Sequence, residues 1–140
     1  LKNTVADLNI DMIGRIDTVQ RNTTEYTYII GSNKLSTGLH EVNEAANKFC
    51  CNLELDYKYN DPSDRLKLYY RSDHYNFAKN NIPVIFYFTG IHPDYHKPTD
   101  TIDKIDFDKM AKIEKLVFNT AWEVANRNDR IIVDVKNDFK

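Results

Sequence analysis

The octapeptide DYHKPTDT, residues 94–101, places a histidine in a setting that suits a metal ligand. His96 follows the apolar stretch 82–88, and Pro93 and Pro98 restrict the backbone on either side of it. A stiffened loop can hold an imidazole in the fixed direction that a metal ion requires. A single loop histidine is more often a surface residue, so His96 alone does not establish a site.

A carboxylate is expected near the same place. Asp11 lies at the end of the alternating stretch 5–13, and open α/β sheets bind ligands beyond the carboxyl ends of their strands. If 5–13 and 82–88 are parallel strands, Asp11 and His96 lie at one edge of the sheet. An aspartate before a turn glycine more often hydrogen-bonds that turn, but three alternating polar residues on this strand require either solvent or a polar site.

Other polar residues are weaker candidates. Residues 72–74, Ser-Asp-His, are read as a helix cap followed by a surface histidine. His92 belongs to a His-x-Asp pattern, but the intervening proline and the short spacing oppose one ion bound by both His92 and His96. Asp94 or Asp100 could orient the His96 imidazole through its second nitrogen, and the sequence leaves that choice open.

Composition describes an ordinary soluble domain. The chain has 140 residues, 41% of them hydrophobic and 29% charged, and a net charge of −2 that indicates neither nucleic acid nor an anionic membrane as partner. No apolar run approaches the roughly 20 residues of a membrane span, and no signal peptide is visible. Cys50 and Cys51 are expected to be free thiols, because adjacent cysteines rarely pair.

Strand and helix periods alternate along the chain, which predicts an α/β fold. We expect a three-layer sandwich in which helices flank a mixed, mostly parallel sheet, with the continuously apolar stretch as a central strand. Two good helices and one short one cover such a sheet thinly, so the chain resembles part of a domain. The predicted strands are 5–13, 25–30, 53–59, 82–88 and 130–135, with 65–70 extended; the predicted helices are 35–50, 73–81 and 107–124, and Ser72 and Asp106 are expected to cap the last two.

Three sequence blocks resemble a known family. NIDMIGR (9–15), SDHYNFAKNNIPVIFYFTG (72–90) and YHKPTDTIDKID (95–106) are similar, in that order, to the second half of the M28 family of zinc aminopeptidases. The resemblance implies a mixed eight-stranded sheet with two zinc ions at the carboxyl ends of central strands. Residues 1–140 are then expected to be the C-terminal portion of a single M28-type domain, without its N-terminal half.

The resemblance assigns roles to four residues. Asp11 is similar to the carboxylate that binds one zinc ion, and His96 to the histidine that binds the other. Tyr95 matches a tyrosine that stabilises the substrate carbonyl as it becomes an oxyanion, and Met12 a residue that lines the pocket for the first side chain of a peptide substrate. The block at 72–74 recurs in the family, and we assign it no role.

The chemistry that the resemblance implies is hydrolysis of N-terminal residues from peptides. Two zinc ions about 3.5–4 Å apart polarise the scissile carbonyl and activate a water. A glutamate moves the proton of that water to the leaving amine, and a tyrosine hydroxyl donates to the oxyanion.

The general base and several ligands of the family are missing from this sequence. There is no adjacent Glu-Glu pair, and two ligands fall short of the three that a catalytic zinc ion normally takes from protein. The chain alone is therefore expected to be inactive and to bind zinc weakly. Its glutamates are at positions 25, 41, 44, 54, 114 and 123.

Two other interpretations remain open. The parent protein could be a non-catalytic binding module on the same fold, although the presence of Asp11, Tyr95 and His96 argues against this. It could also be similar to glutaminyl cyclase, a one-zinc acyltransferase on this fold. Sheet edges left open in a partial domain are expected to favour homo-oligomers, and the family suggests a periplasmic or extracellular location.

Overall fold

The computed structural model describes residues 1–137, which fold around a four-stranded mixed sheet in the order β1-β4-β2-β3. β4 runs parallel to β1 and antiparallel to β2, and β2 runs parallel to β3. The strands are β1 (Asp7–Ile10), β2 (Tyr26–Ile30), β3 (Glu54–Asp56) and β4 (Val84–Phe88).

β4 is the central strand that its apolar sequence predicts. All five of its residues are buried, because helices cover both faces and strands pair with both edges. The register with β1 runs from Asp7 opposite Val84 to Ile10 opposite Tyr87, so the two strands end together. The backbone amide of Asp11 still bonds the Tyr87 carbonyl at 3.2 Å. The loops after β1 and β4 therefore leave the sheet at the same end, the carboxyl end of these two strands.

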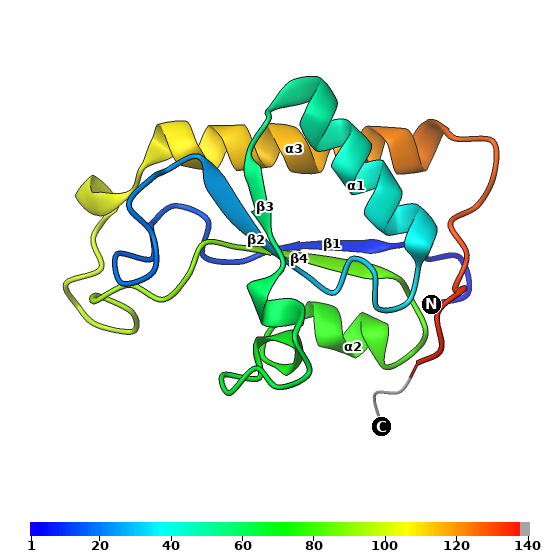
Figure 1. The fold of residues 1–140 in the computed structure, drawn as a ribbon, viewed down its shortest axis with the longest axis horizontal. Helices are drawn as coiled ribbons and strands as arrows, with labels where there is room; N and C mark the ends of the chain where they lie inside the picture. The colour runs from blue at the N-terminus through cyan, green and yellow to red at the C-terminus, as the bar shows by residue number, and fades with distance from the viewer. Residues whose placement is uncertain (138–140) are drawn as a thin grey trace.

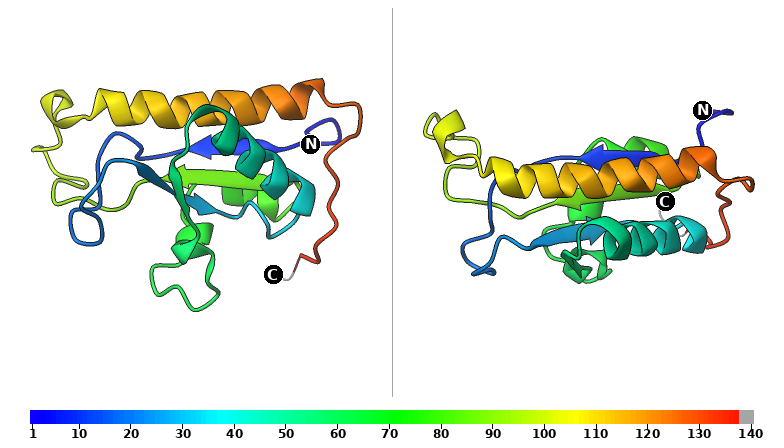
Figure 2. Two further views of the ribbon diagram at one scale, coloured as in Figure 1. Left: turned by 45° about the horizontal axis from the view of Figure 1, so that its top comes forward. Right: turned by 90° about the horizontal axis from the view of Figure 1, so that it is seen from above.

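Helices form the two outer layers (Figures 1 and 2). α1 (Thr37–Cys50) and α3 (Phe107–Asn126) cover one face. α2 (His74–Ala78) and the 3-10 turns η1 (Lys58–Asn60) and η2 (Leu68–Tyr70) lie on the other. A third 3-10 turn, η3 (Ile102–Lys104), precedes α3.

Each of the two long helices begins at an N-cap residue whose side chain accepts a hydrogen bond from the first turn. The side chain of Ser36 accepts from the amide of Leu39 at the start of α1, and that of Asp106 accepts from the amide of Lys109 at the start of α3, as the sequence predicts. A three-layer α/β sandwich with a mixed sheet is thus confirmed.

Each face of the sheet carries its own apolar cluster. Ile29, Ile85 and Tyr87 face α1 and α3, where Leu39, Ile113 and Leu116 complete a fully buried cluster. Tyr28, Phe86 and Phe88 point to the other face and pack on η2 and α2. Side chains thus alternate between the two faces along β2 and β4, and because both faces are covered, every residue of the two strands is buried.

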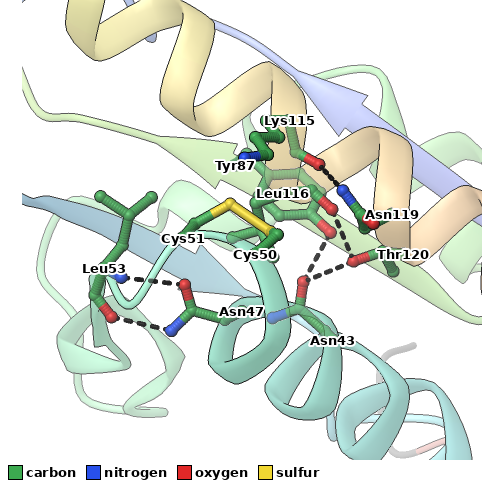
Figure 3. The surroundings of a disulfide bond; sticks show 10 residues. All are labelled: Asn43, Asn47, Cys50, Cys51, Leu53, Tyr87, Lys115, Leu116, Asn119 and Thr120. Carbon is green, nitrogen blue, oxygen red and sulfur yellow. Dashed lines mark hydrogen bonds between the residues drawn. A yellow bond between two sulfur atoms is a disulfide. The ribbon is translucent and has the colours of Figure 1, made fainter.

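The end of α1 contains a disulfide bond between Cys50 and Cys51, so the prediction of two free thiols was wrong (Figure 3). Near the disulfide, two buried asparagine side chains form hydrogen bonds with neighbouring segments. Asn47 bonds both the amide and the carbonyl of Leu53, at 3.0 and 2.8 Å, and Asn43 accepts from the Tyr87 hydroxyl at 2.7 Å. The Asn47 bonds fix the chain reversal between α1 and β3, and the Asn43 bond joins α1 to β4.

Three local predictions were wrong. Residues 65–70 are not extended; a turn leads into η2, and Asp64 accepts from the amides of Leu66 and Leu68. The strand at 53–59 stops at Asp56, where the chain turns into η1. Residues 130–135 form no strand.

The segment 130–135 instead closes over the start of α1. Ile131 is buried, while the amides of Asp134 and Val135 bond the Leu35 carbonyl. The Asp134 carboxylate accepts from the Thr37 amide at 2.8 Å and from the Thr37 hydroxyl. One apolar side chain and a capping carboxylate thus give this segment its place without strand pairing.

Within residues 1–137, no helix has the length and apolar character to cross a bilayer.

Candidate active site

The loops after β1 and β4 lie at the same end of the molecule (Figure 1). Between them is a solvent-open space of about 340 Å³, here called the site hollow. All four residues assigned from the resemblance contribute to it or border it. The site hollow is lined by Asp11, Met12, Arg71, His92, Tyr95, His96 and Asp100.

Asp11 is exposed, and its carboxylate is oriented by Ser72, which lies just before α2. The Ser72 hydroxyl donates to the Asp11 carboxylate at 2.9 Å and accepts from the Asn9 side-chain amide, also at 2.9 Å. Ser72 was predicted to cap α2, but Asp73 occupies the cap position and neither side chain caps the helix. This contact explains two of the three polar residues on that face of β1, Asn9 and Asp11. Sequence reasoning missed it, because nothing local links residue 72 to residue 11.

A threonine at the end of β4 holds the loop that follows β1. The Thr89 hydroxyl is 2.6 Å from the carbonyl oxygens of both Met12 and Arg15. Beside it, a Cβ on Gly90 would lie 2.4 Å from the Cβ of buried Asp17, and the φ of Gly90 is +106°. Only glycine allows the two loops to approach this closely.

Arg15 links the two loops by ion pairs. Its guanidinium bonds Asp94 and Asp100, each at 2.7 Å, so the residues on either side of Tyr95 and His96 are fixed to the β1 loop. Hydrogen bonds from Arg15, Lys104 and Thr99 hold the pKa of Asp94 well below its usual range. Asp94 and Asp100 thus serve Arg15, and no bond from either to the His96 ring is present among the described contacts.

Tyr95 and His96 present their rings together. The ring centroids are 3.8 Å apart and the planes differ by 24°, with Tyr95 half-buried and His96 exposed. His96 has φ +58° and Met12 also has φ +58°, a conformation that costs a non-glycine residue of order 1 kcal/mol or more. Strained backbone of this kind concentrates at functional sites.

Two further histidines, His74 and His92, are buried near the site hollow, and His74 differs from its predicted place at the surface. His74, predicted at the surface, is fully buried and stacks on Phe86 with centroids 4.7 Å apart. Burial lowers the pKa of His74 to about 4. His92 is also buried, with its Nε2 3.7 Å from Asp100, and desolvation followed by the charge of Arg15 lowers its pKa.

The residues of the site hollow fit zinc in kind but not in number. A carboxylate and an imidazole are ordinary zinc ligands, and the Ser72 contact orients the carboxylate as ligands usually are. Among residues 1–137, however, no three His, Cys, Asp or Glu side chains gather closely enough to hold a metal ion. A complete zinc site would need ligands from outside these residues.

Comparison with known proteins gives the family. The model of peptidase family M28 matches residues 1–121. A probable leucine aminopeptidase of Arthroderma otae is 39% identical over 61 residues, and one of Arthroderma benhamiae is 40% identical over 58 residues. These alignments cover 41% and 39% of this chain but only 17% and 16% of the relatives, so the chain matches a small part of them.

Solved aminopeptidases share the fold. The LapA aminopeptidase of Legionella pneumophila superposes with a TM-score of 0.67 at 18% identity, over 89% of this chain and 32% of that one. The aminopeptidase of Aneurinibacillus gives 0.64 at 21% identity, over 96% and 29%, and the zinc aminopeptidase of Bacillus subtilis 0.65 at 19%, over 96% and 33%. The chain thus has a partial zinc-aminopeptidase fold, and it belongs to peptidase family M28.

Proposed function

We propose that this chain forms the C-terminal portion of a di-zinc aminopeptidase domain that removes N-terminal residues from peptides. The observation that carries the proposal is the site hollow. Asp11, Tyr95 and His96 come from loops after two parallel strands and line one open space in an M28 chain. The names of its relatives make leucine a first substrate to try.

Asp11 would hold one zinc ion and His96 the other. When bound, zinc would polarise the scissile carbonyl and lower the pKa of a coordinated water. Tyr95 would donate its hydroxyl proton in a hydrogen bond to the carbonyl oxygen as negative charge develops there. Met12, half-buried at the rim, would contact the first side chain of the substrate.

The remaining ligands and the general base would come from a preceding part of the gene product. The sequence lacks an adjacent Glu-Glu pair, and the described residues hold no cluster of three metal donors. We therefore expect residues 1–140 alone to be inactive. Export to the periplasm or the cell exterior belongs to the same proposal and follows from the family alone.

The experiment compares residues 1–140 with the whole gene product, using leucine p-nitroanilide. We expect turnover only by the whole product, and Tyr95→Phe should lower kcat by roughly 10²-fold, as loss of one oxyanion donor does elsewhere. Tyr57→Phe is the matched control, because Tyr57 directly follows β3 and does not line the site hollow. Peptide binding without turnover would favour the non-catalytic module instead, and cyclisation of N-terminal glutamine without peptidase activity would favour a glutaminyl cyclase.

A further inference from the structure

Arg71, which follows η2 and precedes Ser72 in the sequence, borders the space proposed to hold the substrate. It lines the site hollow with Asp11 and Tyr95. It also lines an adjoining space of about 60 Å³, here called the side pocket. The side pocket is lined by Asp11, Met12, Tyr95 and Arg71 and by the apolar side chains of Leu68, Phe86, Phe88 and Ile91.

The guanidinium of Arg71 has no carboxylate partner among residues 1–137. Its one side-chain hydrogen bond is long, 3.5 Å from Nη1 to the Leu66 carbonyl. Arg15, which borders the same loops, is bound by two carboxylates at 2.7 Å, and Arg21 is bound by Glu54 and Asp56. The charges of Arg15 and Arg21 are thus neutralised inside the protein, whereas that of Arg71 is not.

The residues around Arg71 do not supply another carboxylate to pair with its guanidinium. Asp11 is engaged by Ser72 and is the residue proposed to bind zinc. The remaining walls of the side pocket are apolar apart from the Tyr95 hydroxyl. A carboxylate that enters from solvent would meet a planar, permanently charged donor fork, which matches it with two parallel hydrogen bonds.

We propose that Arg71 binds a carboxylate of the substrate beside the scissile bond, so that the enzyme favours peptides that present one there. The inference rests on the proposed function and adds its substrate class. The carboxylate can come from an acidic N-terminal residue, whose side chain would enter the side pocket, or from the free C-terminus of a dipeptide. Both sources use the same recognition chemistry, and the test separates them.

Binding is tested first, on residues 1–140, by NMR of the arginine Nε–Hε groups. The probes are glutarate and its uncharged counterpart glutaramide. We expect a saturable shift of one arginine resonance with glutarate only. That resonance should vanish in Arg71→Met and persist in Arg65→Met, a matched control because Arg65 is an exposed arginine six residues earlier that lines neither space. No saturable shift, or one that survives Arg71→Met, would overturn the inference.

Specificity is tested on the whole gene product with glutamyl, aspartyl and leucyl p-nitroanilides, and with Leu-Gly against Leu-Gly amide. Arg71→Met should lower the kcat/KM ratio of carboxylate-bearing to neutral substrates by about tenfold or more, the loss of one charge-assisted pair. Arg71→Lys should recover part of it, and Arg65→Met should change nothing. A loss confined to the acidic anilides identifies the side chain, and one confined to the free dipeptide identifies the C-terminus.

The two proposals fail differently. Activity with ratios that do not depend on Arg71 would overturn this inference and leave the aminopeptidase assignment standing. A wild-type gene product inactive on every substrate would overturn the assignment, while the NMR titration would still decide whether Arg71 binds a carboxylate.

Discussion

Replacing Gly90 by alanine should strongly destabilise the end of β4. The added Cβ would lie 2.4 Å from the Cβ of Asp17 and 2.9 Å from its Cγ and Oδ2, at a φ of +106°. These are atoms of a buried residue close to its own backbone, so neither side can move away cheaply. Asp17 accepts from the Tyr28 hydroxyl at 3.2 Å and from the Gln20 amide at 3.1 Å.

The magnitude follows from two costs. An alanine at this φ costs about 1–2 kcal/mol, and losing one or two hydrogen bonds to a buried carboxylate costs about 1.5–3 kcal/mol each. We therefore expect the free energy of unfolding to fall by about 2.5–8 kcal/mol, a large part of the roughly 5–15 kcal/mol of a typical domain.

The assay is urea denaturation of residues 1–140, followed by circular dichroism. Gly38→Ala is the matched control, because Gly38 lies in the first turn of α1 with its nearest neighbours 3.8 Å away. It should stabilise by about 0.5–1 kcal/mol, since alanine is the better helix former. The steric reasoning is refuted if Gly90→Ala changes stability by less than about 1 kcal/mol, or if Gly38→Ala is as harmful.

Three further perturbations test other contacts. Ser72→Ala removes the hydrogen bond to Asp11 and should weaken zinc binding by the whole gene product about tenfold or more, measured by competition with a chromophoric chelator; an unchanged affinity, equal to that of the exposed control Ser63→Ala, would contradict it. The pKa of His74 is about 4 in the folded chain against 6.5 unfolded, so the unfolded state binds the extra proton and stability should fall by up to about 3 kcal/mol as pH drops from 6.5 to 4. Urea midpoints at pH 7 and pH 4.5 measure this, and His74→Phe should flatten the dependence of stability on pH; an equal slope in both proteins would count against it. The outer edge of β1 is unpaired in the described chain and Ile10 is 44% exposed, so residues 1–140 should associate in sedimentation velocity and Ile10→Lys should shift them to monomer; a wild-type monomer at high concentration would exclude this.

Apolar patterns that extend over a whole strand or helix allowed much of the fold to be predicted. The apolar run at 82–88 predicted β4 as the central strand, and the stripe of Ile113, Leu116 and Val117 predicted the face that α3 buries. The errors lie where one tertiary contact outweighs a local pattern. Ile131 reads as a strand residue but is buried against α1, and His74 reads as polar surface but stacks under β4.

The candidate site could be predicted only in part, for a related reason. Asp11 and His96 follow predicted strands, so parallel strand topology suggested that they meet, whereas Tyr95 was assigned only from the family resemblance. The residues that hold them, Ser72, Thr89 and Arg15, act across 61 to 85 positions of sequence. No local period or motif marks such contacts, and they became visible only in three dimensions.

The most direct test of the central claim is zinc content by mass spectrometry. We predict little zinc in residues 1–140 alone and about two ions per molecule in the whole gene product. Asp11→Ala and His96→Ala should each remove about one ion, because each residue is proposed to bind a different zinc. A whole gene product without zinc, or one whose zinc content is unchanged by both substitutions, would contradict the account.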